Sequence, residues 1–221
     1  MEFVVFKLGP LQTNSILAWD KASKEGIVVD PTDDIEQINK EIEAKQVKIK
    51  QIYLTHGHFD HVDLTGTLGK KLGVETSLHQ ADMALYKRSR QLMGILGLQG
   101  GMGDVPDVKT HQPGDIIQLG KSVGRIVHTP GHSPGSCSII FEGTVLSGDT
   151  LFAGNYGRTD LPGGNVDELR NSITEVLFKL PDNTRVLSGI LLIILYFAFM
   201  CVPTGHAEET TIGIEKARFA L

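Results

Sequence analysis

Cysteine, aromatic side chains and an excess of positive charge are all scarce in this chain of 221 residues. Its two cysteines, Cys137 and Cys201, have no Cys-x-x-Cys spacing, which excludes a disulfide framework and favours free thiols in a reducing compartment. The formal net charge is -5 and the Lys and Arg residues are scattered, so no basic patch indicates nucleic acid or an anionic membrane surface. We therefore expect small-molecule partners, while the composition leaves the oligomeric state open.

The N-terminus lacks the pattern of a signal peptide, because Glu2 stands where positive charge is required and the apolar run that follows is short. We expect a cytoplasmic protein. A single long apolar run is present, from Gly189 to Val202. Its length is at or below the roughly 17 to 25 residues that a membrane-spanning helix needs, so membrane contact through residues 189–202 is an alternative that we do not favour.

The hydrophobic pattern predicts one domain over residues 1–221 in which short strands alternate with helices. Thr32 and Asp33 are candidate caps for the first helix, and the glycine-rich stretch Gly94–Gly103 predicts a surface loop. The pattern is typical of an α/β sandwich. The predicted strands are Phe3–Leu8, Asn14–Trp19, Gly26–Asp30, Ile49–Leu54, Val74–Leu78, Ile116–Leu119, Val123–Thr129, Ser136–Phe141, Thr144–Ser147 and Thr184–Leu187, and the predicted helices are Asp33–Gln46, Leu64–Leu72, His79–Met93, Asp167–Leu180 and Thr210–Arg218.

Three imidazoles and a carboxylate lie within six residues directly after one predicted strand, in His56-Gly57-His58-Phe59-Asp60-His61. Neutral imidazole and carboxylate are ligands that zinc and similar divalent metals prefer, and Gly57 permits the sharp turn that brings them together. A polar surface loop is the alternative. The density of ligand-type side chains beside a buried strand favours a metal site, because unpaired ionisable groups are costly there.

Further ligand-type residues follow other predicted strands. His132 lies in a turn rich in proline and glycine, Asp149 follows the strand Thr144–Ser147, and His206 lies in a turn beyond the apolar run. Taken singly, such residues are usually turn histidines and helix-capping aspartates. Together with the His56–His61 loop they indicate a site built at strand ends.

These residues and their flanking motifs resemble the metallo-β-lactamase superfamily, in particular its glyoxalase II-like branch of hydroxyacylglutathione hydrolases. The motifs that carry the resemblance are Gly9–Asn14, His56–His61, Thr129–Ser136, Ser147–Phe152 and Gly157–Gly164. The resemblance implies a four-layer αββα sandwich of two mixed sheets with helices on the outer faces. It also implies two divalent metal ions, with His56, His58 and His132 on the first, Asp60, His61 and His206 on the second, and Asp149 bridging both.

Zinc is the expected metal, with iron and manganese as alternatives. Two such cations lower the pKa of a water molecule between them and stabilise an oxyanion, so a metal-bound hydroxide is the expected nucleophile and Asp60 the expected orienting base. The expected enzyme is a dinuclear hydrolase of a thioester or related activated ester. Within the superfamily, His61 and Asp149 argue against a true β-lactamase, where arginine and cysteine are common, and His58 argues against the flavodiiron relatives, which carry glutamate.

The sequence departs from the branch in two places. We expect no counterpart of the helical region with which full-length glyoxalase II enzymes grip glutathione, and Ser188–Val202 resembles an apolar insertion before the turn that bears His206. Two other functions stay open at this point. One is a mononuclear iron persulfide dioxygenase on the same fold, and the other is a metal-binding or membrane-associated protein whose site the 188–202 insertion has damaged.

Overall fold

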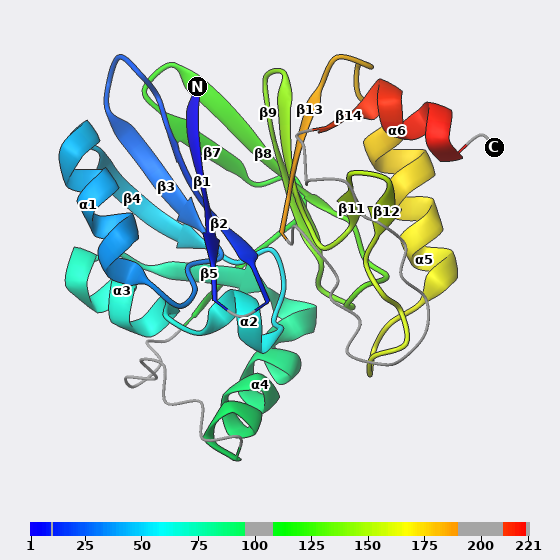
Figure 1. The fold of residues 1–221 in the computed structure, drawn as a ribbon, viewed down its shortest axis with the longest axis horizontal. Helices are drawn as coiled ribbons and strands as arrows, with labels where there is room; N and C mark the ends of the chain where they lie inside the picture. The colour runs from blue at the N-terminus through cyan, green and yellow to red at the C-terminus, as the bar shows by residue number, and fades with distance from the viewer. Residues whose placement is uncertain (10, 96–107, 190–209, 220–221) are drawn as a thin grey trace.

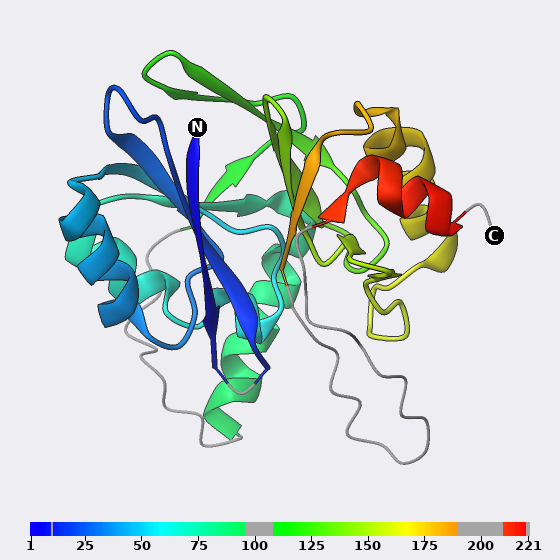
Figure 2. The same cartoon turned by 45° about the horizontal axis from the view of Figure 1, so that its top comes forward.

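Two six-stranded sheets pack face to face, with helices on their outer faces (Figure 1). The computed structural model describes residues 1–9, 11–95, 108–189 and 210–219. Figure 2 shows the same layers from a second direction, with α1 and α3 on one side and α5 and α6 on the other. The predicted αββα sandwich is confirmed.

The first sheet has the order β1-β2-β3-β4-β5-β6 and is antiparallel from β1 to β3 and parallel from β3 to β6. Its parallel strands end at the same edge, which places the segments after β4, β5 and β6 near one another. The strands are β1 (Glu2–Leu8), β2 (Thr13–Trp19), β3 (Glu25–Val29), β4 (Lys48–Tyr53), β5 (Thr76–His79) and β6 (Lys109–His111).

The second sheet has the order β14-β13-β10-β9-β8-β7. It is antiparallel except between β10 and β13, which are parallel. A separate two-stranded hairpin, β11 (Leu151–Phe152) and β12 (Asn155–Tyr156), follows β10. The sheet strands are β7 (Ile116–Leu119), β8 (Ser122–His128), β9 (Cys137–Phe141), β10 (Thr144–Gly148), β13 (Arg185–Ser188) and β14 (Thr210–Thr211).

Helices cover both outer faces, and three further helical segments lie at the edge where β4 and β5 end (Figure 1). On the first sheet these are α1 (Ile35–Lys45) and α3 (Thr65–Leu72). On the second they are α5 (Val166–Asn171), its continuation as a π-helical turn (Ser172–Val176) and a 3₁₀ turn (Leu177–Lys179), and α6 (Ile212–Phe219). The edge segments are α2 (Phe59–Val62), the 3₁₀ turn η1 (Gln80–Asp82) and α4 (Met83–Ile95).

Strand β2 shows how the alternation of side chains builds two apolar layers. Ile16 and Ala18 lie in the core between the sheets, whereas Leu17 and Trp19 lie in the core beneath α1 and α3. Every residue of β2 is buried as a result. A strand buried on both faces holds its ends rigidly, and β2 begins at Thr13, next to the candidate site.

Several local predictions differ from the structure. Asp34 caps α1 by accepting hydrogen bonds from the N–H groups of Glu36 and Gln37, whereas Asp33 has a positive φ of 51° and does not serve as the cap. The predicted helix Asp167–Leu180 is α-helical only to Asn171 before it continues as π and 3₁₀ turns. The short elements α2, β6 and the β11–β12 hairpin were not predicted, because periodicity over two to four residues carries little signal.

Two sequence predictions fall largely on residues beyond those described. Ser188, the last residue of β13, and Gly189 are the described part of the predicted apolar insertion. Residues 190–202 of the insertion and residues 96–103 of the predicted glycine-rich loop lie outside the described residues. In the part of the chain that the structure describes, no helix has both the length and the apolar character needed to cross a membrane.

Candidate metal centre

The candidate site lies where ends of strands from the two sheets meet. The carbonyl oxygen of Thr55, two residues after β4, accepts a hydrogen bond of 2.9 Å from the N–H of Cys137 at the start of β9. Gly148, the last residue of β10, packs so closely on Thr55 that a Cβ there would lie 2.6 Å from Oγ1 of Thr55. The His56–His61 loop therefore faces the segments that carry His132 and Asp149.

Three of the predicted ligands form one compact group: His56, His58 and His132. One nitrogen of each ring lies within 4.8 Å of those of the other two, and Nδ1 of His58 is 2.8 Å from Nε2 of His132. The three ring centroids are separated by 4.6 to 4.8 Å. Three imidazoles converging at this spacing match the ligand set of a catalytic zinc or similar ion.

A second group centres on His61. Its Nε2 lies 3.5 Å from Oδ2 of Asp60 and 3.5 Å from Oδ1 of Asp149. The other oxygen of Asp149, Oδ2, is 3.5 Å from Nε2 of His132. Asp149 therefore lies between the two groups with one oxygen toward each. His206, the remaining predicted ligand of this group, lies outside the described residues.

Asp30 directs the ring nitrogens of two of these histidines and was not singled out from the sequence. Its Oδ2 accepts hydrogen bonds from the hydroxyl of Thr55 at 2.6 Å and from Nδ1 of His61 at 3.0 Å, and its Oδ1 accepts one from the N–H of Thr55 at 2.7 Å. Because the Thr55 hydroxyl donates to Asp30, it accepts from Nδ1 of His56, 3.0 Å away. Both histidines thereby direct Nε2 into the site.

Asp30, His56 and His61 also form a compact group of ligand-type atoms. We interpret Asp30 as an outer partner rather than a ligand, because three donors already occupy its carboxylate. His132 has an equivalent partner, since its Nδ1 is 2.8 Å from the carbonyl oxygen of Arg158 and must donate to it, which leaves Nε2 with a lone pair.

Three buried atoms that face the site make no hydrogen bond with the described residues. These are Nε2 of His56, Nε2 of His61 and Oδ1 of Asp149. Leaving buried polar atoms unsatisfied costs roughly 1 to 3 kcal/mol each, and a metal ion would satisfy all three. Their number, chemistry and direction fit divalent metal ions.

Burial and neighbouring charge divide the histidines into two electrostatic classes. Burial lowers the pKa of His58 to about 3, with a further contribution from His132, and burial also holds the pKa of His56 well below its usual range. Burial acts in the same direction on His61, but Asp149, Asp60 and Asp30 outweigh it and raise its pKa to about 10. Without metal at neutral pH, His61 is therefore protonated while His56 and His58 are neutral.

Three other histidines gather near the site but do not form a ligand group. His79 stacks on His128 with ring centroids 4.5 Å apart and planes inclined by 23°, and His111 lies 6.1 Å from His79. A metal ion lies in the plane of the imidazole that binds it, so two parallel stacked rings cannot share one ion. This cluster is therefore separate from the candidate metal centre.

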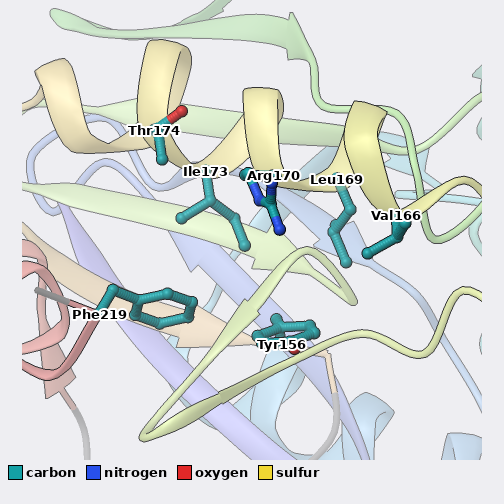
Figure 3. A pocket seen from close by; sticks show the side chains of 7 residues that line it. All are labelled: Tyr156, Val166, Leu169, Arg170, Ile173, Thr174 and Phe219. Atoms are coloured by element: carbon teal, nitrogen blue, oxygen red, sulfur yellow. The ribbon is translucent and has the colours of Figure 1, made fainter. Parts of the chain in front are cut away.

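The structure also contains an apolar pocket between the α5 segment, β12 and the end of α6 (Figure 3). Leu169 and Ile173 line one side, and Tyr156 and Phe219 lie opposite. None of the six described ligand candidates lines this pocket. We therefore locate the chemistry at the strand ends and not in this cavity.

Comparison with known proteins gives the family. The model of the metallo-beta-lactamase superfamily matches residues 8–189, and the chain belongs to this superfamily. It is 31% identical to hydroxyacylglutathione hydrolase GloC of Haemophilus influenzae over 98% of this chain and 95% of that protein. Membership supports use of divalent metal by a hydrolase-like fold without fixing which metal is used.

Two solved structures resemble the chain closely. One is the BLEG-1 B3 metallo-beta-lactamase, with a TM-score of 0.77 and 31% identity over 98% of this chain and 97% of that one. The other is TTHA1623 in a di-iron-bound form, with a TM-score of 0.77 and 31% identity over 96% of each chain. The His and Asp side chains of the site therefore suit iron as well as zinc.

Metal binding is expected to release a proton from His61. With a pKa of about 10 the ring carries a proton on Nε2 at pH 6, and this nitrogen must lose it to bind a metal. Zn²⁺ titrations at pH 6, in two buffers with different ionisation enthalpies, should show release of about one proton per chain. At that pH a zinc-bound water, with a pKa of about 7, is still largely un-ionised.

His61→Asn provides the control and should release about one proton fewer. Equal proton release by both proteins would contradict the assignment.

The raised pKa of His61 also makes the stability of the metal-free protein depend on pH. The stabilisation from protonated His61 is complete below the unfolded pKa of 6.5 and is lost as the pH rises through about 10.

Asp30→Asn should weaken Zn²⁺ binding by roughly 10- to 100-fold, because an amide cannot accept all three hydrogen bonds that orient Thr55 and His61. Competition with a chromophoric chelator measures this. Asp20→Asn is a matched control, since Asp20 also accepts several hydrogen bonds, from Ala22, Ser23 and Ser122, but in a turn that belongs to neither ligand group. Unchanged affinity in Asp30→Asn would refute the orienting role.

Proposed function

We propose that the protein is a metal-dependent hydrolase that uses water to cleave a thioester of the hydroxyacylglutathione type or a related activated ester. The position of Asp149 carries the proposal, because its two oxygens face His61 and His132 at 3.5 Å each. One carboxylate between two ligand groups suits a pair of divalent cations. Such ions, when bound, lower the pKa of a coordinated water and polarise a carbonyl group.

The candidate ligands divide between two ions. One ion would be bound by His56, His58 and His132. The other would take ligands from Asp60 and His61, and Asp149 would contact both ions. We propose His206 as a further ligand of the second ion on the basis of the sequence resemblance alone. Zinc is the proposed metal, with iron as the alternative that the di-iron-bound relative supports.

Asp60 is the proposed proton acceptor. Its Oδ2 accepts a hydrogen bond from the hydroxyl of Thr13 at 3.3 Å, and its Oδ1 makes no hydrogen bond with the described residues. We propose that Oδ1 takes the proton of the attacking water as the new C–O bond forms. The C–S bond then breaks and the sulfur leaves as a thiolate, which needs no proton from an acid at this step.

The identity with hydroxyacylglutathione hydrolase GloC supports this substrate class. The structural similarity to a B3 metallo-beta-lactamase favours a second candidate reaction, the hydrolysis of a β-lactam amide. That reaction must expel an amine, which requires that Asp60 return the proton it accepted from the water, whereas a thiolate leaves without a proton. We therefore favour the thioester.

The test is a substrate panel with the zinc-loaded and the iron-loaded protein. Release of thiol from S-D-lactoylglutathione, followed with a thiol reagent, is expected to exceed hydrolysis of a cephalosporin, and a chelator should abolish it. If the iron-loaded protein consumes oxygen with glutathione persulfide and the zinc-loaded protein does not, the protein is instead a dioxygenase. Absence of thiol release with both metals would refute the proposal.

His58→Ala should reduce both metal content and thioester turnover by more than about 100-fold, beyond the range for loss of an outer partner. His111→Gln is the matched control, because it removes a buried imidazole that belongs to neither ligand group. Full metal occupancy with wild-type turnover in His58→Ala would remove the His56–His61 loop from the site.

A further inference from the structure

Asp82 is a fully buried carboxylate that lies behind the metal centre and belongs to neither ligand group. It is the last residue of η1, which follows β5. Among the residues that the structure describes, no Lys or Arg forms an ion pair with it. A buried carboxylate without a cation is costly unless hydrogen bonds compensate its charge, so its partners indicate its purpose.

Three hydrogen bonds compensate Asp82, and all come from the two loops that carry the first ligand group. Its Oδ2 accepts from the N–H of Gly57 at 2.9 Å and from the hydroxyl of Ser133 at 2.6 Å. Its Oδ1 accepts from the N–H of Gly135 at 2.6 Å. Gly57 separates His56 from His58, and Ser133 directly follows His132. One carboxylate is thus bonded next to every histidine of the group.

The packing shows that the two loops close tightly on this segment. A Cβ on Gly57 would lie 2.9 Å from the backbone nitrogen of Tyr86 and 3.0 Å from the carbonyl oxygen of Asp82. A Cβ on Gly135 would lie 2.7 Å from Cβ, Cγ and N of Asp82. Either contact would force the backbone to shift. Glycine in both loops is therefore what allows Asp82 to reach both peptide N–H groups.

The Gly57 peptide is fixed from a second direction as well. Its carbonyl oxygen accepts a hydrogen bond of 2.7 Å from the hydroxyl of Ser89 in α4, while its N–H donates to Asp82. The segment from η1 into α4 therefore holds the backbone between His56 and His58 at both of its polar groups.

We propose that Asp82 is a positioning residue of the metal centre, which sets the spacing between the His56–His58 pair and His132 by binding the backbone of both loops. The proposal deepens the metal-dependent function proposed above and rests on it. Asp82 acts through the ligands and contacts neither metal nor substrate. Its negative charge also favours a cation in the site, because no other cation neutralises it among the described residues.

Zn²⁺ affinity of Asp82→Asn, measured by competition with a chromophoric chelator and without substrate, tests the proposal. Asparagine keeps one acceptor oxygen and turns an N–H₂ group toward a donor, so affinity should fall roughly 10- to 100-fold. Thermal unfolding of the metal-free protein is measured in parallel, because any loss of a buried hydrogen-bonded carboxylate also lowers stability.

Glu215→Gln is the matched control. Glu215 is also fully buried and accepts hydrogen bonds from Gly154, Thr210 and Arg218, but it ties α6 to the β11–β12 hairpin and not to the ligand loops. We expect both variants to unfold at lower temperature and only Asp82→Asn to lose zinc affinity. Equal affinity losses in both variants, or a change of less than about twofold in Asp82→Asn, would overturn the positioning role.

Ser133→Ala gives the same answer if Asp82→Asn does not fold. It removes a single hydrogen bond to Asp82 and leaves those of Gly57 and Gly135, so affinity should fall about fivefold. No change in this variant would also count against the proposal. A wild-type protein that binds no Zn²⁺ at all would overturn the metal-dependent function itself, an outcome that differs from all of these.

Discussion

Buried hydrogen bonds that fix which nitrogen of His56, His61 and His132 faces the site are the interaction on which the candidate metal centre depends. A hydrogen bond to one nitrogen of a histidine fixes the tautomer and the ring orientation, so that the other nitrogen is presented to a metal. Asp30 does this for His61 directly and for His56 through Thr55, and the carbonyl of Arg158 does it for His132. The result is that Nε2 of His56, His61 and His132 is directed into the site, where a metal ion would take its lone pair once His61 has lost its proton.

The fold makes this possible by joining two rigid sheets at one edge. Strand β2 is buried on both faces, and the β4 end is bonded to β9 across the sandwich through Thr55 and Cys137. The loops that carry the ligands are consequently short and closely packed, with little freedom to separate. The same closeness concentrates carboxylates around His61, which raises its pKa and makes metal binding compete with a proton.

The sequence allowed the prediction of the sandwich and of the ligand residues that the structure brings together. His56, His58, Asp60 and His61 could be identified because they lie within six residues, and His132 and Asp149 because each follows a predicted strand within a recognisable motif. Their convergence depends on the tertiary fold, but it could be predicted because residues that follow the strands of an α/β sandwich gather at one edge of it. Asp30 carried a weak signal of the same kind, since it is an acid directly after a strand and before Pro31.

Asp82 could not be identified in this way. It falls inside a segment predicted as a helix, and its partners Gly57 and Ser133 are 25 and 51 residues away in the sequence. No local pattern distinguishes it from an ordinary acid in a first helical turn, where such residues are favoured for other reasons. The cap of α1 was misplaced by one residue for a similar reason, because the choice between Asp33 and Asp34 depends on a backbone angle.

Anomalous X-ray diffraction from crystals of the zinc-loaded protein tests the two-ion site most directly. We expect two anomalous peaks per chain at the zinc edge, one about 2.0 to 2.1 Å from ring nitrogens of His56, His58 and His132 and one at similar distance from Asp60 and His61. Asp149 should contact both ions. A single peak, or two peaks that leave Asp149 outside one coordination shell, would contradict the shared carboxylate at the centre of the proposed mechanism.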